Sequence, residues 1–314
     1  MQPMIELLSA SPALFVGLCL ILGLLVGSFL NVVIHRLPLM LDRQWREQCA
    51  QIAASDAAGQ SVPSEAAAAS TAPDEKPAER FNLVVPRSAC PSCHAPITAA
   101  QNVPIVSYLF LRGRCAHCGV RIGMRYPLVE ALTGVLSGFV AWKYGFGWPA
   151  LAALVLTWFL IALTFIDLDK QLLPDDLTLP LLWIGLTLSL YAHPELSPVP
   201  VDPRSSIIGA VAGYLSLWIV YHLFRLVTGK EGMGYGDFKL LAALGAWLGW
   251  KMLLPIILIA AAVGAVVGIT TLTLRGQSRS TPIAFGPFLA AAGWLMLMFG
   301  PELVTGYLGL FAPR

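Results

Sequence analysis

Hydrophobic residues dominate this chain in long runs that are separated by short polar segments. Four runs approach or exceed the roughly 20 residues that an α-helix needs to cross a bilayer. They cover residues 13–34, 128–148, 207–227 and 253–274. Four shorter runs lie between or after them, at 150–166, 177–192, 238–250 and 283–299. The pattern therefore predicts an all-α polytopic membrane protein with about eight transmembrane helices.

The composition agrees with this pattern, because 57% of the 314 residues are hydrophobic and 12% are charged, with a mean hydropathy of +0.72. Soluble domains carry about twice that share of charged residues, so the lipid bilayer is the first partner that we expect. The formal net charge of +2 argues against a nucleic-acid partner. The first apolar run is too long for a signal peptide, and no Lys or Arg precedes it, so we expect it to stay as a helix.

Basic residues are distributed unevenly between the predicted loops. If eight spans alternate and the N-terminus lies outside, nearly all of the 20 Lys and Arg residues fall on one side. The exceptions are Lys143, Arg204, Lys251 and Arg314. Because basic residues concentrate in cytoplasmic loops, both termini are predicted outside and the long polar segment in the cytoplasm.

The run 238–250 is shorter than a bilayer is thick. A helix over these residues extends about 20 Å, whereas the hydrocarbon core measures about 30 Å. Short segments interrupted by glycine occur in membranes where they line a cavity or where other parts of the protein cover them. We therefore expect an enclosed helix, a local thinning of the bilayer or a re-entrant segment.

The polar segment between the first and second apolar runs divides into two parts. Residues 48–80 are rich in Ala, Ser, Pro and acidic residues without apolar periodicity, which predicts a flexible linker. Residues 81–126 contain two pairs of cysteines. The predicted division is a first transmembrane helix in 1–36, a cytoplasmic domain in 37–126 and a transmembrane bundle in 127–314.

The cysteines form two Cys-x-x-Cys pairs, Cys90 with Cys93 and Cys115 with Cys118. Each pair can place two thiolates on one ion, and four thiolates complete the tetrahedral shell of a structural zinc site. Disulfides are the alternative, but a cytoplasmic location disfavours them, and no thioredoxin-like pattern supports a redox pair. We predict Zn²⁺ in a small zinc-ribbon-like domain, with Pro104 to Leu111 as a strand of the ribbon.

Two aspartates lie where an apolar run meets a loop, Asp167 after 150–166 and Asp237 before 238–250. A carboxylate at the edge of hydrocarbon is costly to solvate, so each is a candidate functional group. Asp167 is opposed by the dipole of a helix C-terminus, whereas Asp237 has an alternative role as a helix cap. Together they are candidates for an acid and a base, as in aspartic proteases, where a carboxylate activates water and a neutral acid protonates the carbonyl oxygen.

Other charged residues near these positions have simpler explanations. Asp175 and Asp176 fit the N-cap of the next helix, and Asp169 points away from Asp167 if the helix continues. A further hypothesis is that these three acids attract a positively charged segment of the substrate.

Polar residues also close the first helix and open the second. His35 and Arg36 suit a helix C-terminus and the inner lipid headgroups. Glu130, near the start of the second apolar run, suits the helix dipole and the cytoplasmic interface. For these three residues we expect an anchoring role.

The chain resembles the type IV prepilin peptidases, the bifunctional leader peptidases and N-methyltransferases of pilus assembly and type II secretion, over nearly its whole length. The resemblance rests on the two Cys-x-x-Cys pairs and on four segments, Gly27 to Pro38, Arg125 to Glu130, Ile166 to Asp175 and Gly229 to Lys239. The last of these contains the sequence Gly-Tyr-Gly-Asp.

The resemblance implies an aspartic protease of the bacterial inner membrane, with Asp167 and Asp237 as the catalytic pair and the active site facing the cytoplasm. In this family the substrates are prepilins and pseudopilins with a short basic leader, cut before an apolar helix that usually starts with Phe. The new amino group is then methylated with S-adenosylmethionine. The resemblance also implies that the four cysteines hold zinc and that the cytoplasmic domain takes part in methylation.

Two other classes stay open at this point. A presenilin-like intramembrane protease uses the same pair of aspartates but cuts within a membrane helix and has no methyltransferase activity. A proton-coupled transporter places its acids near the middle of the membrane. The positions of Asp167 and Asp237, at the predicted cytoplasmic ends of their helices, favour access to a soluble leader peptide.

Overall fold

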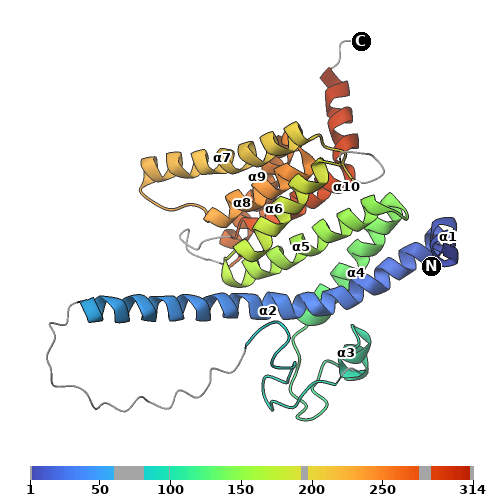
Figure 1. The fold of residues 1–314 in the computed structure, drawn as a ribbon, viewed down its shortest axis with the longest axis vertical. Helices are drawn as coiled ribbons and strands as arrows, with labels where there is room; N and C mark the ends of the chain where they lie inside the picture. The colour runs from blue at the N-terminus through green and yellow to red at the C-terminus, as the bar shows by residue number, and fades with distance from the viewer. Residues whose placement is uncertain (1, 60–80, 99, 192–196, 276–283, 312–314) are drawn as a thin grey trace.

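A computed structural model describes residues 2–59, 81–98, 100–191, 197–275 and 284–311. Within these ranges the regular structure is helical and no continuous strand occurs. Figure 1 shows the helices α4 to α10 gathered in one bundle, with α2 along one side of it. A small lobe that contains α3 lies on the other side of α2 from the bundle (Figure 1).

The longer helices are α2 (Pro12–Gly59), α4 (Arg125–Tyr144), α5 (Trp148–Lys170), α7 (Pro203–Thr228), α9 (Leu253–Arg275) and α10 (Gly286–Phe311). The shorter ones are α1 (Gln2–Ala10), α3 (Val106–Phe110), α6 (Asp175–Ser189) and α8 (Tyr235–Leu248), with 3₁₀ turns η1 (Ala100–Asn102) and η2 (Trp250–Met252). Each of the eight predicted apolar runs corresponds to one of these helices, although residues 192 and 283 at the ends of two runs lie outside the described ranges.

Four helical segments are long and apolar enough to cross a membrane by length and composition. They are Pro12–Asp56, Trp148–Lys170, Pro203–Thr228 and Trp250–Thr271. The expected all-α membrane fold is thereby confirmed, and shorter apolar helices complete the bundle.

Helix α8 lies at the centre of the bundle. Its residues from Leu240 to Leu248 are all buried, and it contacts α6, α7, α9 and α10. A helix that is apolar all round must be covered on all sides. With 14 residues it extends only about 21 Å. The neighbouring helices therefore provide its environment in place of lipid, as one of the expectations for this short run requires.

Glycines allow the closest contacts between helices. A Cβ atom on Gly209 of α7 would collide with the carbonyl oxygen of Gly245 in α8. A Cβ atom on Gly27 of α2 would lie 2.7 Å from the Cα atom of Glu130 in α4. Small residues let helix backbones approach in this way inside a membrane, where packing replaces the hydrophobic effect as the source of association.

Helix α2 is longer than the first apolar run. It passes Pro38 without ending and continues to Gly59. Residues 48–59 are therefore helical where the sequence analysis expected a linker, and residues 60–80 of that linker lie outside the described ranges. The division into three domains stays a prediction.

The apolar run from Pro104 to Leu111 forms helix α3, so the prediction of a ribbon strand is wrong. A strand needs a neighbouring strand to satisfy its backbone groups, and the described part of the lobe offers only isolated bridges. A helical turn satisfies the backbone locally, for example through the bond of 2.9 Å from the N–H of Leu109 to the carbonyl of Ile105.

Candidate active site and four-cysteine cluster

Asp167 lies in the last turn of α5, with 5% of its surface exposed. The helix ends after Lys170 because Gln171 adopts a left-handed conformation, with φ of 51°, and donates its N–H to the carbonyl of Asp167 at 2.8 Å. Asp169, two residues further, turns the other way and pairs with Arg125 of α4. As expected, one of these two acids points into the bundle, and it is Asp167.

Asp237 is the third residue of α8 and is 6% exposed. The helix begins after Gly234, whose carbonyl accepts the N–H of Asp237 at 3.2 Å. No side chain caps this helix. Asp237 is therefore not the N-cap residue itself, but its carboxyl group reaches back to the backbone N–H of Gly234, so the capping role of the alternative interpretation is partly present.

The structure brings the two acids together. Their carboxyl groups are close enough to interact electrostatically. Leu173, in the loop after α5, connects their surroundings, because a Cβ atom on Gly236 would lie 2.6 Å from Leu173 Cβ and one on Gly286 would lie 3.1 Å from Leu173 Cδ1. The same Cβ position on Gly286 is 2.5 Å from Asp167 Oδ2. Helix α10 can thus approach Asp167 because its first residue has no side chain.

Each carboxyl group has one buried oxygen without a hydrogen-bond partner among the described residues, Oδ2 in Asp167 and Oδ1 in Asp237. Leaving such a group unpaired costs about 1–3 kcal/mol, so proteins normally avoid it. Two buried acids that interact electrostatically and have unpaired oxygens are unfavourable for folding alone. This arrangement is typical of a functional site.

Two ion pairs lie beside the acids. Lys239, two residues after Asp237, places its Nζ atom 2.6 and 2.8 Å from the carboxylate oxygens of Asp175 at the start of α6. Arg125 pairs with Asp169 in the same way. These acids already have cationic partners, which weakens the hypothesis that they attract a basic segment of the substrate. Asp176 is the acid of that group without an ion pair in the described structure.

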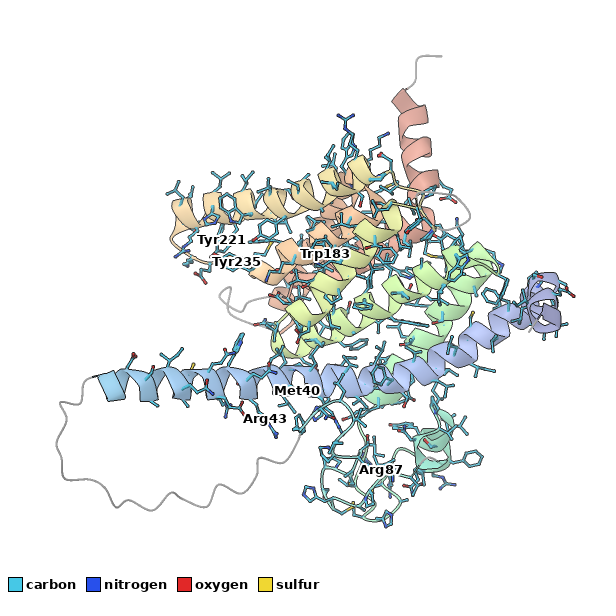
Figure 2. All side chains as sticks on the ribbon, in the orientation of Figure 1. Met40, Arg43, Arg87, Trp183, Tyr221 and Tyr235 are labelled. Carbon is cyan, nitrogen blue, oxygen red and sulfur yellow. The ribbon has the colours of Figure 1, made fainter. Side chains whose placement is uncertain are left out.

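Aromatic side chains fix the beginning of α8 against α7. The ring of Tyr221 lies 5.4 Å from that of Tyr235 and 5.7 Å from that of Phe238, measured between centroids. Figure 2 shows Tyr221 and Tyr235 at the same end of the bundle. Tyr235 and Phe238 flank Asp237 in the sequence, and Tyr221 packs on both of them. These contacts restrict the position of the Asp237 backbone.

The four cysteines form a second cluster, in the lobe. The Sγ atoms of Cys90, Cys93, Cys115 and Cys118 all lie within 4.8 Å of one another, and those of Cys90 and Cys118 are 3.8 Å apart. Tetrahedral zinc with bonds of about 2.3 Å separates its sulfur ligands by about 3.8 Å. The donor set and its geometry therefore fit a metal ion of this kind.

The two cysteine pairs occupy backbone turns of the same form. The N–H of His94 donates to the carbonyl of Cys90, and the N–H of Gly119 donates to that of Cys115, both at 3.0 Å. One isolated antiparallel bridge closes each turn. Backbone N–H groups of the turn, first that of Cys93, lower the pKa of the Cys90 thiol to about 6. The pKa of Cys115 is lowered too, whereas that of Cys93 is raised, so the turns favour the thiolate, the form that binds metal, at the first cysteine of each pair.

Sequence comparisons identify the family. A profile of the type IV leader peptidase family matches residues 154–269, and one of the bacterial peptidase A24 N-terminal domain matches residues 21–144. A prepilin leader peptidase/N-methyltransferase of Aeromonas salmonicida (strain A449) is 51% identical over 308 residues, which cover 98% of this chain and 99% of the relative. The chain belongs to the type IV leader peptidase family.

Proteins with the same name from Pseudomonas aeruginosa and Neisseria gonorrhoeae are 50% and 48% identical to this family member. The matches cover 98% and 90% of this chain, and 98% and 89% of the relatives. No solved structure matches the chain.

The first matched region of this leader peptidase family member ends before α5, and the second begins within α5. The first contains the cysteine lobe, and the second contains both aspartates. Gly286 lies outside both regions, and sequence reasoning missed it. The available signal was a glycine directly before Pro287 at the start of an apolar run, where a close backbone approach is one of the few reasons for glycine.

The contacts between α2 and the cysteine lobe were also missed by sequence reasoning. Arg36 is buried and donates from Nη1 to the carbonyls of Asn82 at 3.0 Å and Leu83 at 3.4 Å. It does not reach lipid headgroups as expected, although the neighbouring His35 is exposed. Arg43, labelled in Figure 2, stacks on Phe81 with its guanidinium carbon 4.0 Å from the ring centroid. These arginines of α2 hold the lobe.

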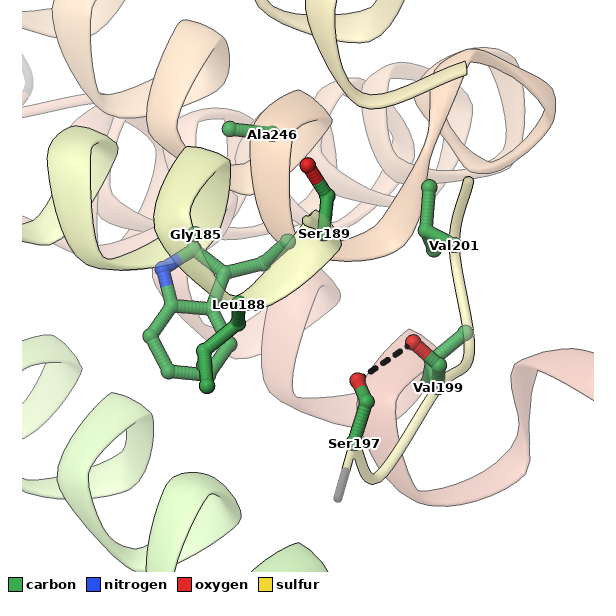
Figure 3. A pocket seen from close by; sticks show the side chains of 8 residues that line it. Gly185, Leu188, Ser189, Ser197, Val199, Val201 and Ala246 are labelled. Atoms are coloured by element: carbon green, nitrogen blue, oxygen red, sulfur yellow. Dashed lines mark hydrogen bonds between the residues drawn. The ribbon is translucent and has the colours of Figure 1, made fainter. Parts of the chain in front are cut away.

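A small pocket lies at the other end of α6 and α8, away from the acids (Figure 3). It is lined by Gly185, Ser189, Ser197 and Trp247, among others, and its volume of about 10 Å³ has room for about one water molecule. The hydroxyl of Ser197 donates to the carbonyl of Val199, as Figure 3 shows. Ligand sites usually exceed about 300 Å³, so this pocket is a packing defect and not a second site.

Proposed function

We propose that this chain is a leader peptidase and N-methyltransferase. It removes the short basic leader from type IV prepilins and pseudopilins, and it methylates the new amino group with S-adenosylmethionine as the donor. The observation that carries the proposal is the meeting of Asp167 and Asp237, two buried acids on different helices. Membership of the family, and the names of relatives about half identical over nearly the whole chain, support it.

In this proposal the two acids share one proton and act as a coupled pair. The ionised carboxylate takes a proton from water, and the water oxygen attacks the carbonyl carbon of the scissile bond. The neutral acid gives its proton to the carbonyl oxygen at the same time. When the tetrahedral intermediate collapses, the C–N bond breaks and the nitrogen takes up a proton. The products are the leader, with a new carboxyl group, and the shortened pilin, with a free amino group.

We place the protein in the bacterial inner membrane with these acids near the cytoplasmic face. The distribution of Lys and Arg supports this orientation. The Arg125–Asp169 pair, at the start of α4 and the end of α5, supports a position of Asp167 near a membrane face. A proton-coupled transporter would need its acids near the middle of the membrane. The end position favours a protease that reaches a soluble leader.

The four cysteines of the lobe are the proposed zinc ligands. When bound, the ion supplies a cross-link between the two cysteine turns and takes no part in peptide hydrolysis. Four thiolates leave no open coordination position for water or substrate. The cysteines themselves keep residues 88–97 and 113–122 in their turns, and we assign the lobe to the methylation step.

The test separates cleavage from methylation. The purified protein in lipid vesicles receives an intact prepilin in one assay and a pilin without its leader in the other. Asp167→Asn and Asp237→Asn should each reduce cleavage by a factor of roughly 10³, because each variant removes one partner of the acid–base pair. Both should still methylate the pilin without its leader. Cys93→Ser should lose metal and methylation while cleavage persists.

Asp42→Asn is the matched control, because Asp42 is exposed on α2 and pairs with Arg46 in the same helix. It should leave both reactions unchanged. Cleavage that survives in Asp167→Asn or in Asp237→Asn would refute the two-aspartate mechanism. A cysteine variant that loses metal and keeps full methylation would remove the role assigned to the lobe.

A further inference from the structure

Helix α3 exposes large apolar side chains at the surface of the cysteine lobe. Leu109 is 68% exposed and Phe110 is 84% exposed, and Val106 beside them is 48% exposed. A cluster of this kind on one short element is unfavourable in water and marks a surface that something covers.

A hydrogen bond fixes the depth of α3 relative to the membrane helices. The backbone N–H of Ile105, directly before α3, donates to Glu130 Oε2 at 2.9 Å. Glu130 lies five positions after Arg125, the first residue of α4, so its backbone is about 7.5 Å further along the helix. The Glu130 side chain leans back toward Arg125, as helical side chains do. Because Arg125 and its partner Asp169 mark the ends of two membrane helices, α3 begins near that level, at the membrane boundary.

The position of α3 is rigid. Ile105 has φ of 58°, a conformation that a β-branched residue rarely adopts, so the surrounding contacts must hold it. Glu130 is buried against Gly27 of α2. Any residue larger than glycine at position 27 would collide with the Cα atom of Glu130. The lobe cannot easily turn α3 outward while the bond between Ile105 and Glu130 exists.

The surroundings of α3 match the boundary of a bilayer. Figure 1 shows α3 on the side of the lobe that faces the α1 end of α2, along the membrane-spanning part of that helix. Apolar side chains are also exposed on α4, the helix that carries Glu130, where Leu128 and Val135 are examples. Arg112 and Arg114, just after α3, are exposed as well, and basic residues beside an apolar element suit anionic lipid headgroups.

We propose that α3 is an interfacial element, which inserts Leu109 and Phe110 into the lipid leaflet around the Arg125 end of α4. The cysteine lobe therefore lies against the membrane instead of projecting into water. The occupant of the apolar surface is lipid, because the bond between Ile105 and Glu130 joins α3 to the membrane helix α4, and the exposed Arg112 and Arg114 that follow α3 suit lipid headgroups. This inference depends on the membrane topology and not on the catalytic role of the aspartates.

The experiment uses the full, unmodified chain in vesicles of neutral and anionic phospholipids that carry a photoreactive diazirine on the acyl chain. After irradiation, mass spectrometry locates the lipid adducts. We expect adducts within residues 106–111 at several times the yield found at Val84, with a further increase in anionic vesicles. Val84 is the matched control, an apolar residue of the same lobe that is 78% exposed.

Val84 is expected to stay in water because Arg36 holds its segment. Arg36 lies nine residues after Gly27 on α2, so this contact is about 13 Å further from the membrane than the contact of Gly27 with Glu130. The double variant Leu109→Ser and Phe110→Ser should lose the adducts on α3 and keep its metal content. Equal yields at Val84 and at α3 would overturn the proposal. Cross-links from α3 to a second copy of the chain, without lipid adducts, would overturn it too and would identify an interface between copies.

Discussion

Replacement of Gly286 by alanine tests the geometry around Asp167 directly. The Cβ atom would lie 2.5 Å from Asp167 Oδ2, 3.2 Å from Asp167 Cγ and 3.1 Å from Leu173 Cδ1. Atoms in ordinary contact are about 3.5 Å apart, so the carboxyl group or the start of α10 must move by about 1 Å. A displacement of about 1 Å at reacting groups can reduce a rate about 10²-fold.

The expected result is a specific loss of turnover. Gly286→Ala should lower kcat for prepilin cleavage by about 10²-fold, with little change in KM, because the substrate-binding surface is unaltered. The fold should tolerate the change, since Gly286 has no positive φ and alanine is favourable in a first helical turn. Cleavage of a purified prepilin, measured by mass shift in vesicles, gives both constants.

Gly17→Ala is the control for this variant, because a Cβ atom at Gly17 meets nothing within 4 Å. It should keep wild-type kinetics and thermal stability. Methylation of a pilin without its leader should be normal in both variants. If Gly286→Ala cleaves at the wild-type rate in folded protein, Asp167 is not the reacting group or does not react from the position described.

Three further predictions concern the surroundings of the site. Fewer than four protons should be released per zinc ion bound at neutral pH, because the pKa of Cys90 is lowered to about 6 and this thiol is already ionised above that pH. Calorimetry in several buffers measures the number of protons, and a release of four would contradict the lowered pKa. Arg36→Gln should weaken the attachment of the lobe to α2 by about 1–3 kcal/mol and speed hydrogen exchange in the lobe. Arg46→Gln, which breaks only an exposed ion pair with Asp42, should have neither effect. Lys239→Met should slow cleavage about two- to fivefold, which corresponds to the free energy of a partly exposed ion pair. The double variant Lys239→Asp with Asp175→Lys exchanges the two charges and should restore most of the rate; if it restores none, the pair does not position α8.

The parts of the molecule that were predictable from the sequence depend on the contrast between apolar and polar residues. Long apolar runs predict membrane helices because the backbone must satisfy its own hydrogen bonds in lipid. Asp167 and Asp237 were identified for the same reason, since a carboxylate beside hydrocarbon has a high energetic cost. The cysteine cluster followed from its spacing alone. These signals are local, and each can be recognised without knowledge of what packs where.

The missed features depend on contacts between distant segments. Arg36 was expected at lipid headgroups, but it is buried against backbone carbonyls near Asn82, and nothing in its own neighbourhood indicates that partner. Gly286 matters through Asp167, which lies more than a hundred residues earlier in the chain. Residues 104–111 were expected as a strand because short apolar runs do not distinguish a strand from a helix. Tertiary packing decides such cases.

The short length of α8 is linked to the placement of Asp237. A carboxyl group needs water for hydrolysis, yet Asp237 is 6% exposed and its helix extends only about 21 Å. If α8 faced lipid, its ends would leave backbone groups unsatisfied in hydrocarbon. Because α6, α7, α9 and α10 enclose it, α8 does not need to span the bilayer, and the pair of Lys239 with Asp175 holds its beginning against the start of α6. The enclosure thus keeps Asp237 away from lipid and near Asp167, at one end of the bundle, where the proposed hydrolysis needs water to enter.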